Sequence, residues 1–336
     1  MTAAASAPPA QPGAASPFAA AQQAVDHVRR LLRPFRFEVW LTLGFAAFLD
    51  QCGRGTSGGT GGSPPPLPAS NWRGMPSLPD LPRELPAELP LLLLAAALVL
   101  VVAVAFVALV LWIGSRGIFV YLDCVTGGVY LDCVTSGRPE IGRPWRRHAA
   151  LADSLFAWRF ALACVTLAVV LLIVGLGALA VHSAAYGRIA SGIGLGLALG
   201  VLLPLLALAV LAATLASVAL RDFVAPLQLR HRCSCGEAVE LLRPLLEARP
   251  GAFAIYALLK LAFSVAASLV AFVAGCVTCC LGFLPIVGQT LLQPLYLFER
   301  AWSLALLREL TGDDAFLPQV RTASAVPGDA GPVRAV

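Results

Sequence analysis

Apolar and polar residues alternate along this chain in long blocks. The clearest block, residues 91–113 (LLLLAAALVLVVAVAFVALVLWI), contains no charged residue and lies between Pro90 and Gly114. At about 1.5 Å per residue, a helix of this length crosses the roughly 30 Å hydrocarbon core of a bilayer. A buried helix of a soluble protein would carry a polar stripe, and this block has none. It therefore predicts a membrane-spanning helix, around which the rest of the chain is interpreted.

Further apolar blocks predict an all-α, polytopic transmembrane bundle of about six crossings arranged as three helical hairpins. The crossings are expected at residues 36–51, 91–113, 155–181, 189–220, 252–275 and 281–298. The first of them is shorter than a bilayer requires, so its length leaves open whether it spans or re-enters.

Amphipathic helices are predicted beside these crossings. Residues 18–32 place apolar side chains at spacings of three and four, after Ser16 as N-cap and Pro17 at the first helical position. A second such helix is indicated by Ser234-x-x-Glu237, which has the form of a capping box. Arginines on their polar faces suit a cytoplasmic membrane surface.

The remaining segments are poor in periodic apolar residues. Residues 1–15 and 312–336 are expected to be disordered tails on either side of a membrane domain at 16–311, and residues 52–90 form a Gly- and Pro-rich outer loop.

Residues 120–128 (VYLDCVTGG) and 129–137 (VYLDCVTSG) form a tandem duplication. The duplication fits either helical pieces broken at Gly127-Gly128 or a β-hairpin turning there. The hairpin would set Asp123 opposite Asp132, a like-charge pair that costs energy, which favours the broken helix.

Arginine placement gives the orientation. Lysine and arginine total 24, and the single lysine is Lys260, which leaves 23 arginines. With six crossings, Arg159 lies inside a span, four arginines lie outside and the remaining 18 (23 − 1 − 4) lie inside. The four on the outer side are Arg54, Arg73, Arg83 and Arg188. This bias predicts that both termini are cytoplasmic.

Composition restricts the class of protein. Hydrophobic residues make up 58% of the chain and charged residues 13%, which is typical of a membrane protein. The net charge of +5 is dispersed in short clusters beside apolar blocks, so nucleic acid is not an expected partner.

Ionisable residues inside crossings are the main candidates for function, because burying them in lipid is costly. Arg159 lies near the start of its helix, where it can reach the headgroups or pair with Asp153 or Glu299. Lys260 lies deeper. It either lines a polar cavity or is satisfied by the neighbouring helix. The candidate intramembrane polar positions are Arg159, Lys260, Gln289, Gln293 and Glu299.

No arrangement of residues indicates catalysis, a cofactor or a metal. The four histidines lie on separate segments, without a Ser/His/Asp order. Cys276-x-x-Cys279-Cys280 lacks a second ligand pair nearby, so packing of small residues is the favoured interpretation over zinc or redox chemistry.

Three stretches carry a resemblance: PFRFEVWLTLGFAAFL, RPWRRHAALADSLFAWRF and CCLGFLPIVGQTLLQPLYLFERAWSLALLREL. There the chain resembles uncharacterised bacterial multi-pass membrane proteins, themselves similar to the membrane domain that accompanies some glycerophosphodiester phosphodiesterases. The resemblance covers roughly residues 17–311 and implies a bacterial inner-membrane helical bundle. It does not imply phosphodiesterase activity, because the soluble catalytic domain has no counterpart here. The nine-residue duplication departs from the single copy that the resemblance leads us to expect.

The sequence thus predicts a non-enzymatic integral inner-membrane protein, a scaffold or partner-binding module in contact with membrane lipids and with a protein partner on the cytoplasmic face. The alternative is a transporter or lipid-handling protein with a polar cavity near Lys260.

Overall fold

A computed structural model describes residues 16–32, 37–52, 89–126, 142–185, 192–278, 284 and 286–317. All regular secondary structure within these ranges is helical. Predictions for the 1–15 tail, for most of the outer loop and of the C-terminal tail, and for the second copy of the duplication fall outside the described residues. The first copy continues a helix through Val125, as the broken-helix interpretation requires.

The helices fall into three classes by length: short, intermediate and long. The short helices are α5 (Gly142–Arg147), α8 (Ala225–His231), α11 (Val287–Leu291) and a 3-10 turn, η4 (Asp314–Phe316). Those of intermediate length are α1 (Pro17–Leu31), α2 (Phe37–Gln51), α9 (Cys235–Ala248) and α12 (Gln293–Thr311). The long helices are α3 (Leu89–Val125), α6 (Ala149–Ala185), α7 (Gly192–Ala219) and α10 (Pro250–Val277), and a π-helical turn, η2 (Leu220–Val224), joins α7 to α8.

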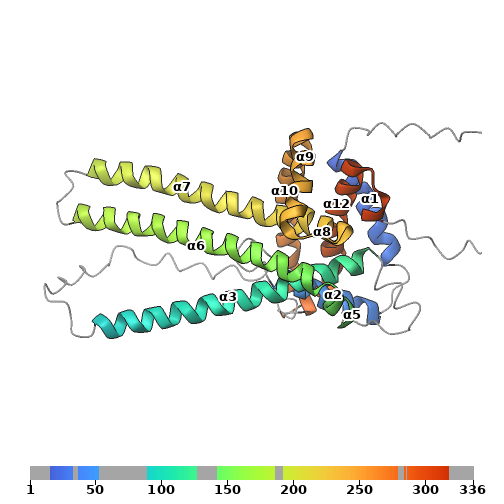
Figure 1. Ribbon diagram of the computed structural model, residues 1–336, viewed down its shortest axis with the longest axis horizontal. Helices are drawn as coiled ribbons and strands as arrows, with labels where there is room; N and C mark the ends of the chain where they lie inside the picture. The colour runs from blue at the N-terminus through green and yellow to red at the C-terminus, as the bar shows by residue number, and fades with distance from the viewer. Residues whose placement is uncertain are drawn as a thin grey trace, which may run out of the picture.

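Three of the long helices project from a compact core. In Figure 1, α3, α6 and α7 extend together in one direction, and the other helices gather at one end of them. The projecting parts expose large apolar side chains, among them Leu98, Val165 and Leu208, each more than 60% exposed. Exposure of so much apolar surface to water is energetically unfavourable, so these parts suit the interior of a bilayer.

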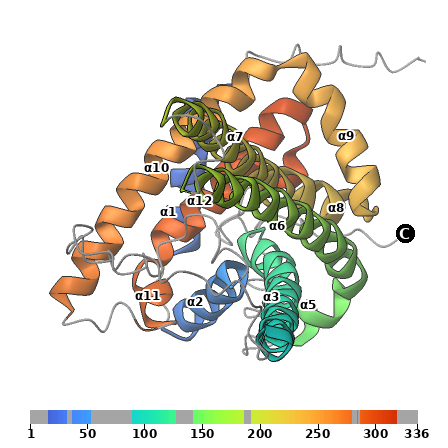
Figure 2. The same ribbon diagram turned by 90° about the vertical axis from the view of Figure 1, so that its left-hand side faces the viewer.

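The chain is accordingly an all-helical protein with helices long and apolar enough to cross a membrane. Within the described residues there are four such candidates, at Ala97–Val125, Ala149–Ala180, Gly200–His231 and Pro250–Val277. Figure 2, viewed from the tips of the projecting helices, shows α3, α6 and α7 foreshortened and α10 in side view next to them. The fourth candidate therefore differs in direction from the other three.

Two of the six predicted crossings differ in the structure. The segment expected at 36–51 is α2, whose 15 residues cover only about 22 Å. The segment expected at 281–298 is no single helix, because the chain turns at Leu292 between α11 and α12, and Pro294 occupies the first turn of α12. Six crossings in three hairpins are thus not confirmed.

The expected hairpin of 36–51 with 91–113 is also different. In such a hairpin the end of the first helix would lie near residue 91, but the end of α2 lies against Gly117. A methyl group added at Gly117 would come within 2.4 Å of the carbonyl carbon of Leu49 and 2.7 Å of the amide nitrogen of Asp50. The two helices cross at a point where only glycine fits, and this crossing places Asp50 inside the core.

The hydrophobic core forms around α12. Leu297, Ala301 and the run Leu304–Leu307 are all buried there. They pack against the inner end of α3, where Ile118, Phe119 and Leu122 have no exposed surface, and against α1. Every residue of α12 from Glu299 to Leu307 is buried, so this part of the helix lies inside the core.

The predicted helix at 18–32 exists as α1, and part of its apolar stripe packs on the core. Ala20, Val28 and Leu31 are buried there, whereas Phe18 is 61% exposed and Val25 is also exposed. Small residues such as Ala20 allow close packing on α12, and Phe18 and Val25 remain available to lipid.

Polar contacts fix α1 at both ends. Near its start, Glu309 accepts hydrogen bonds from the Ser16 amide and from Gln23 Nε2, each at 2.9 Å. Near its end, His27 Nε2 lies 2.9 Å from the Val125 carbonyl oxygen and donates to it. The second amphipathic helix, α9, begins with the predicted capping box of Ser234 and Glu237.

We expect Gly117→Ala to destabilise the fold, because the new methyl group meets backbone atoms that cannot rotate away. The expected loss is about 1–3 kcal/mol of unfolding free energy, measured by denaturant or thermal unfolding in detergent. The matched control is Gly175→Ala in α6, where an added methyl group meets nothing within 4 Å. Equal stability of the two variants would contradict the close crossing of α2 and α3.

We expect the docking of α1 to weaken in mild acid. Burial, and to a smaller extent the charge of Arg30, lowers the pKa of His27 below 6.5, although the Val125 hydrogen bond acts in the opposite direction. The folded state then binds fewer protons than the unfolded state, so stability is complete above pH 6.5 and falls as the pH drops towards the lowered value. Limited proteolysis after Arg29 or Arg30 should therefore accelerate between pH 7.5 and pH 5.5.

The control for this prediction is His27→Gln, which removes the titrating ring and should give a proteolysis rate that does not rise over the same range. Glu309, whose pKa is raised by burial, acts with the opposite sign and favours docking as the pH falls. A rate that rises equally in acid for His27→Gln would exclude His27 as the cause.

Candidate functional site: a buried cluster of charges

Two adjacent residues of opposite charge lie where α7 meets the core. Arg221 and Asp222 belong to the π-helical turn η2 and are both buried. A π turn adds one residue to a helix and widens it locally, a device that often occurs at functional sites. Here the turn directs both side chains into the core, where they contact residues of α2, α10 and α12.

Arg221 joins α7 to α2 and α12. Its guanidinium group forms a forked ion pair with both carboxylate oxygens of Asp50, the Nε–Oδ1 distance being 3.2 Å. Its Nη1 donates to Glu299 Oε1 at 3.2 Å. Arg300 donates from Nη1 to the backbone carbonyl of Arg221 at 2.7 Å, and its Nη2 lies 3.7 Å from Asp50.

Lys260 joins α10 to the same group of residues. Its Nζ forms an ion pair with Asp222 and lies 3.2 Å from Glu299 Oε1. The Tyr256 hydroxyl donates to Asp222 Oδ2 at 3.0 Å, and Arg300 Nη1 lies 3.5 Å from the other oxygen of Asp222. Asp222 therefore receives contacts from both neighbouring helices.

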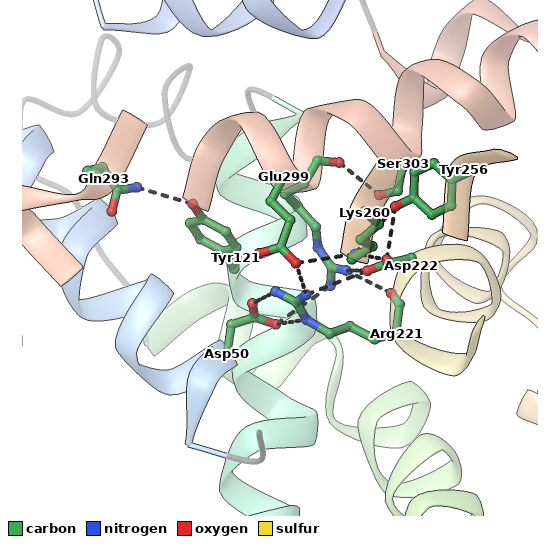
Figure 3. Close-up of polar contacts among 10 residues, drawn as sticks. Asp50, Tyr121, Arg221, Asp222, Tyr256, Lys260, Gln293, Glu299 and Ser303 are labelled. Carbon is green, nitrogen blue, oxygen red and sulfur yellow. Dashed lines mark hydrogen bonds and ion pairs between the residues drawn. The ribbon is translucent and has the colours of Figure 1, made fainter. Parts of the chain in front are cut away.

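These residues define the charge cluster: Asp50, Arg221, Asp222, Lys260, Glu299 and Arg300. Figure 3 shows Asp50, Arg221, Asp222, Lys260 and Glu299 converging between the helices. Three cations face three carboxylates, so the formal charge of the cluster is zero, and every one of these side chains is 7% exposed or less. A buried charge is tolerated only when it is paired and hydrogen-bonded, and each member of this cluster has partners of opposite sign.

Neutral side chains surround the charge cluster. Aromatic rings enclose the Tyr256 side, where Phe223 and Trp302 pack edge-on against Tyr256 at centroid distances of 5.2 and 5.1 Å. On the other side Gln293 Nε2 donates to the Tyr121 hydroxyl at 3.3 Å. This shell keeps the ion pairs dry and therefore strong.

The structure places the five candidate positions in three locations. Lys260 and Glu299 lie in the charge cluster and contact each other, and Gln293 lies beside it (Figure 3). Arg159 is elsewhere, on α6, and donates to Ser115 Oγ at 3.2 Å. Gln289 accepts a hydrogen bond from the Ile286 amide at 2.8 Å and caps α11. The partners of Lys260 are the carboxylates of Asp222 and Glu299.

Four members of the charge cluster were not identified from sequence: Asp50, Arg221, Asp222 and Arg300. A signal for them exists, because Arg221-Asp222 and Glu299-Arg300 are both adjacent pairs of opposite charge beside apolar segments. Such pairs can neutralise each other across two helices. Asp50 has no comparable local signal, since its partners come from residues more than 170 positions away.

The described part of the chain contains no group of three or more His, Cys, Asp or Glu side chains placed to hold a metal ion. Cys276 is exposed, and its sequence neighbours Cys279 and Cys280 lie outside the described residues. Burial raises the pKa of Cys235 to about 12, so that thiol is protonated at neutral pH and unreactive.

Comparison with known proteins gives one result. The model of a family of unknown function, DUF7544, matches residues 15–311. No curated protein and no solved structure matches the chain. The match agrees with the expected uncharacterised membrane family and gives no link to the membrane domain that accompanies glycerophosphodiester phosphodiesterase.

We expect Lys260→Met to lower the unfolding free energy by about 3–5 kcal/mol, because it leaves a buried carboxylate uncompensated. The double variant Lys260→Met with Asp222→Asn restores a formal charge of zero and should be more stable than the sum of the single effects predicts. Chemical unfolding of all variants measures this coupling.

The control for this experiment is Arg243→Met, which removes an exposed (i, i+4) pair with Glu247 and should change stability by no more than about 0.5 kcal/mol. Strictly additive effects of Lys260→Met and Asp222→Asn would contradict the buried ion pair.

Proposed function

The chain belongs to the DUF7544 family of unknown function, and from the structure of its core we propose that it is a non-enzymatic membrane scaffold that presents a cytoplasmic helical core to a protein partner. In this proposal α3, α6 and α7 anchor the chain in the membrane lipids, and the core of α1, α2, α8, α9 and α12 carries the binding surface.

The observation that carries the proposal is the zero formal charge of the buried charge cluster. Lys260, the strongest candidate for a ligand-binding group, is engaged with Asp222 and Glu299. A transport or catalytic group must exchange partners during its cycle, whereas these ion pairs connect α2, α10 and α12 to η2 and hold the core together. The polar residues of the charge cluster thus have a structural role, which is to hold these helices together, and no ligand is needed to account for their burial.

Arginine placement supports the proposed orientation. Arg230 in α8, Arg232 just after it and Arg243 in α9 lie at the core end of the projecting helices. In the sequence, the stretch between the apolar blocks 155–181 and 189–220 contains a single arginine, Arg188. By the positive-inside rule the core then faces the cytoplasm of a bacterial inner membrane. Because α1 and α12 pack together in the core, the segments that lead to the two termini would leave the core on the cytoplasmic side.

The proposed contact surface is the outer face of α9. The inner face of this helix is held to the core by Cys235, Ala238 and Leu242, which are buried. Leu241 and Leu246 lie at the two edges where this inner face meets the outer face, with charged side chains between them around the helix, and each is more than 40% exposed. Exposed apolar side chains of this kind can anchor a protein partner.

The alternative left by the sequence is a transporter or lipid-handling protein with a polar cavity at Lys260. It requires Lys260 to bind a ligand directly, which in turn requires the Asp222 and Glu299 contacts to open. The two functions therefore differ in what the charge cluster does, and this difference can be measured.

Native mass spectrometry of the gently solubilised chain, with identification of bound lipids and proteins, tests the proposal. A scaffold should retain a protein partner in fixed stoichiometry. The Lys260→Met, Asp222→Asn double variant should keep that partner, because the charge balance is retained. Leu246→Glu at the edge of the outer face of α9 should lose it, with Leu208→Ala on α7 as a control outside the surface.

The proposal fails if the chain retains no protein, or if the bound species is a stoichiometric small molecule that the double variant no longer holds. The second result would support the transporter or lipid-handling alternative.

A further inference from the structure

A second polar site lies away from the charge cluster, where the inner end of α3 meets α5, α8 and η4. It is a pocket of about 290 Å³, and we call it the basic pocket. The polar residues that line it are Asp123, Thr126, Arg147, His148, Arg230 and Arg232. Leu122, Leu229, Leu304 and Phe316 form its apolar wall.

His148 is the buried polar group of the basic pocket. Its residue is only 4% exposed, and its ring stacks beside Phe119. Its Nε2 atom has no hydrogen-bond partner among the described residues and lies 3.7 Å from Asp123 Oδ1, which is too far for a direct hydrogen bond. Since buried polar groups are nearly always satisfied, this nitrogen is available to a bound molecule.

The arginines of the basic pocket are not equivalent. Arg230 Nε donates to Asp313 Oδ2 at 2.7 Å, and this hydrogen bond lowers the pKa of Asp313, so the charge of Arg230 is compensated. Arg147 and Arg232 make no ion pair within the described part of the chain and are exposed at the rim. Together these two arginines carry two positive charges, and the lining contains the single carboxylate of Asp123, so the pocket is positively charged.

The backbone of Arg232 supports a functional role for this rim. Its φ of 52° is left-handed, an uncommon conformation for a residue other than glycine. Glycine would relieve the strain at this helix end, where a left-handed residue terminates α8. The conformation ends α8 at the edge of the pocket and holds a guanidinium group there at a cost in backbone energy.

We propose that the basic pocket binds a phosphate ester, with Arg147 and Arg232 as the ligands of its phosphate group and His148 as a hydrogen-bonding group for its polar part. Guanidinium groups match the oxygens of a phosphate in a fork that a lysine cannot form. The apolar wall suits the aliphatic part of such an ester, and the volume fits a headgroup rather than a whole lipid.

This site is independent of the scaffold proposal, because none of its lining residues belongs to the charge cluster or to the outer face of α9. Its occupant would contact α5, α8 and the inner end of α3 at once, and would thereby fix the core against the membrane anchor. The phosphate ester comes either from a lipid headgroup at the inner leaflet or from a soluble phosphate ester, and the two sources can be distinguished by experiment.

The test uses the full chain in zwitterionic detergent or in nanodiscs. Binding of phosphatidylglycerol is measured by native mass spectrometry against phosphatidylcholine, and binding of glycerol 3-phosphate by calorimetry. The Arg147→Gln, Arg232→Gln double variant should weaken the binding at least tenfold. The matched control is Arg146→Gln, which removes a neighbouring arginine of α5 that does not line the pocket, and thermal unfolding confirms that both variants are folded.

Retention of phosphatidylglycerol that soluble phosphate does not displace would assign the site to a lipid headgroup. Displacement by glycerol 3-phosphate would assign it to soluble phosphate esters. The proposal is overturned if neither probe binds, or if the double variant binds as tightly as Arg146→Gln.

Discussion

The fold depends on a balance of buried charge. Three cations and three carboxylates, contributed by α2, η2, α10 and α12, meet in a space without solvent. Removing each ion from water costs several kcal/mol, and only partners in good geometry compensate for that cost. Apolar packing tolerates small shifts between helices, whereas this network is satisfied only when all four elements lie in one arrangement. The hydrophobic core around α12 stabilises the molecule, and the charge cluster selects how the helices are arranged.

The π turn makes this arrangement possible. Two sequential residues of a regular α-helix point about 100° apart, and the wider turn at η2 allows Arg221 to reach α2 while Asp222 reaches α10. The same turn marks the boundary between the exposed part of α7 and its buried continuation in α8. A local irregularity of the backbone therefore couples the membrane anchor to the core.

Periodicity and length were sufficient to predict the helical class, the long apolar helices, α1 and the capping box of α9, because each depends on neighbours within a few residues. The crossings expected at 36–51 and 281–298 are not confirmed, because α2 is shorter than a bilayer requires and the second segment is divided at Leu292 between α11 and α12. Lys260 and Glu299 were found because ionisable residues in apolar segments are rare. Asp50 was missed, since its role depends on residues brought together only by folding, and the basic pocket was missed because its arginines are distributed over separate segments.

The direction of α10 has a consequence for the shape of the surrounding lipid. This helix is about 42 Å long and lies beside α3, α6 and α7 at a steep angle to them (Figure 1 and Figure 2). If those three helices follow the bilayer normal, α10 lies along one leaflet and displaces lipid there, while among the described helices only α3, α6 and α7 extend to the opposite leaflet. The molecule is then wider on one side than on the other, a wedge that is accommodated best where the membrane curves.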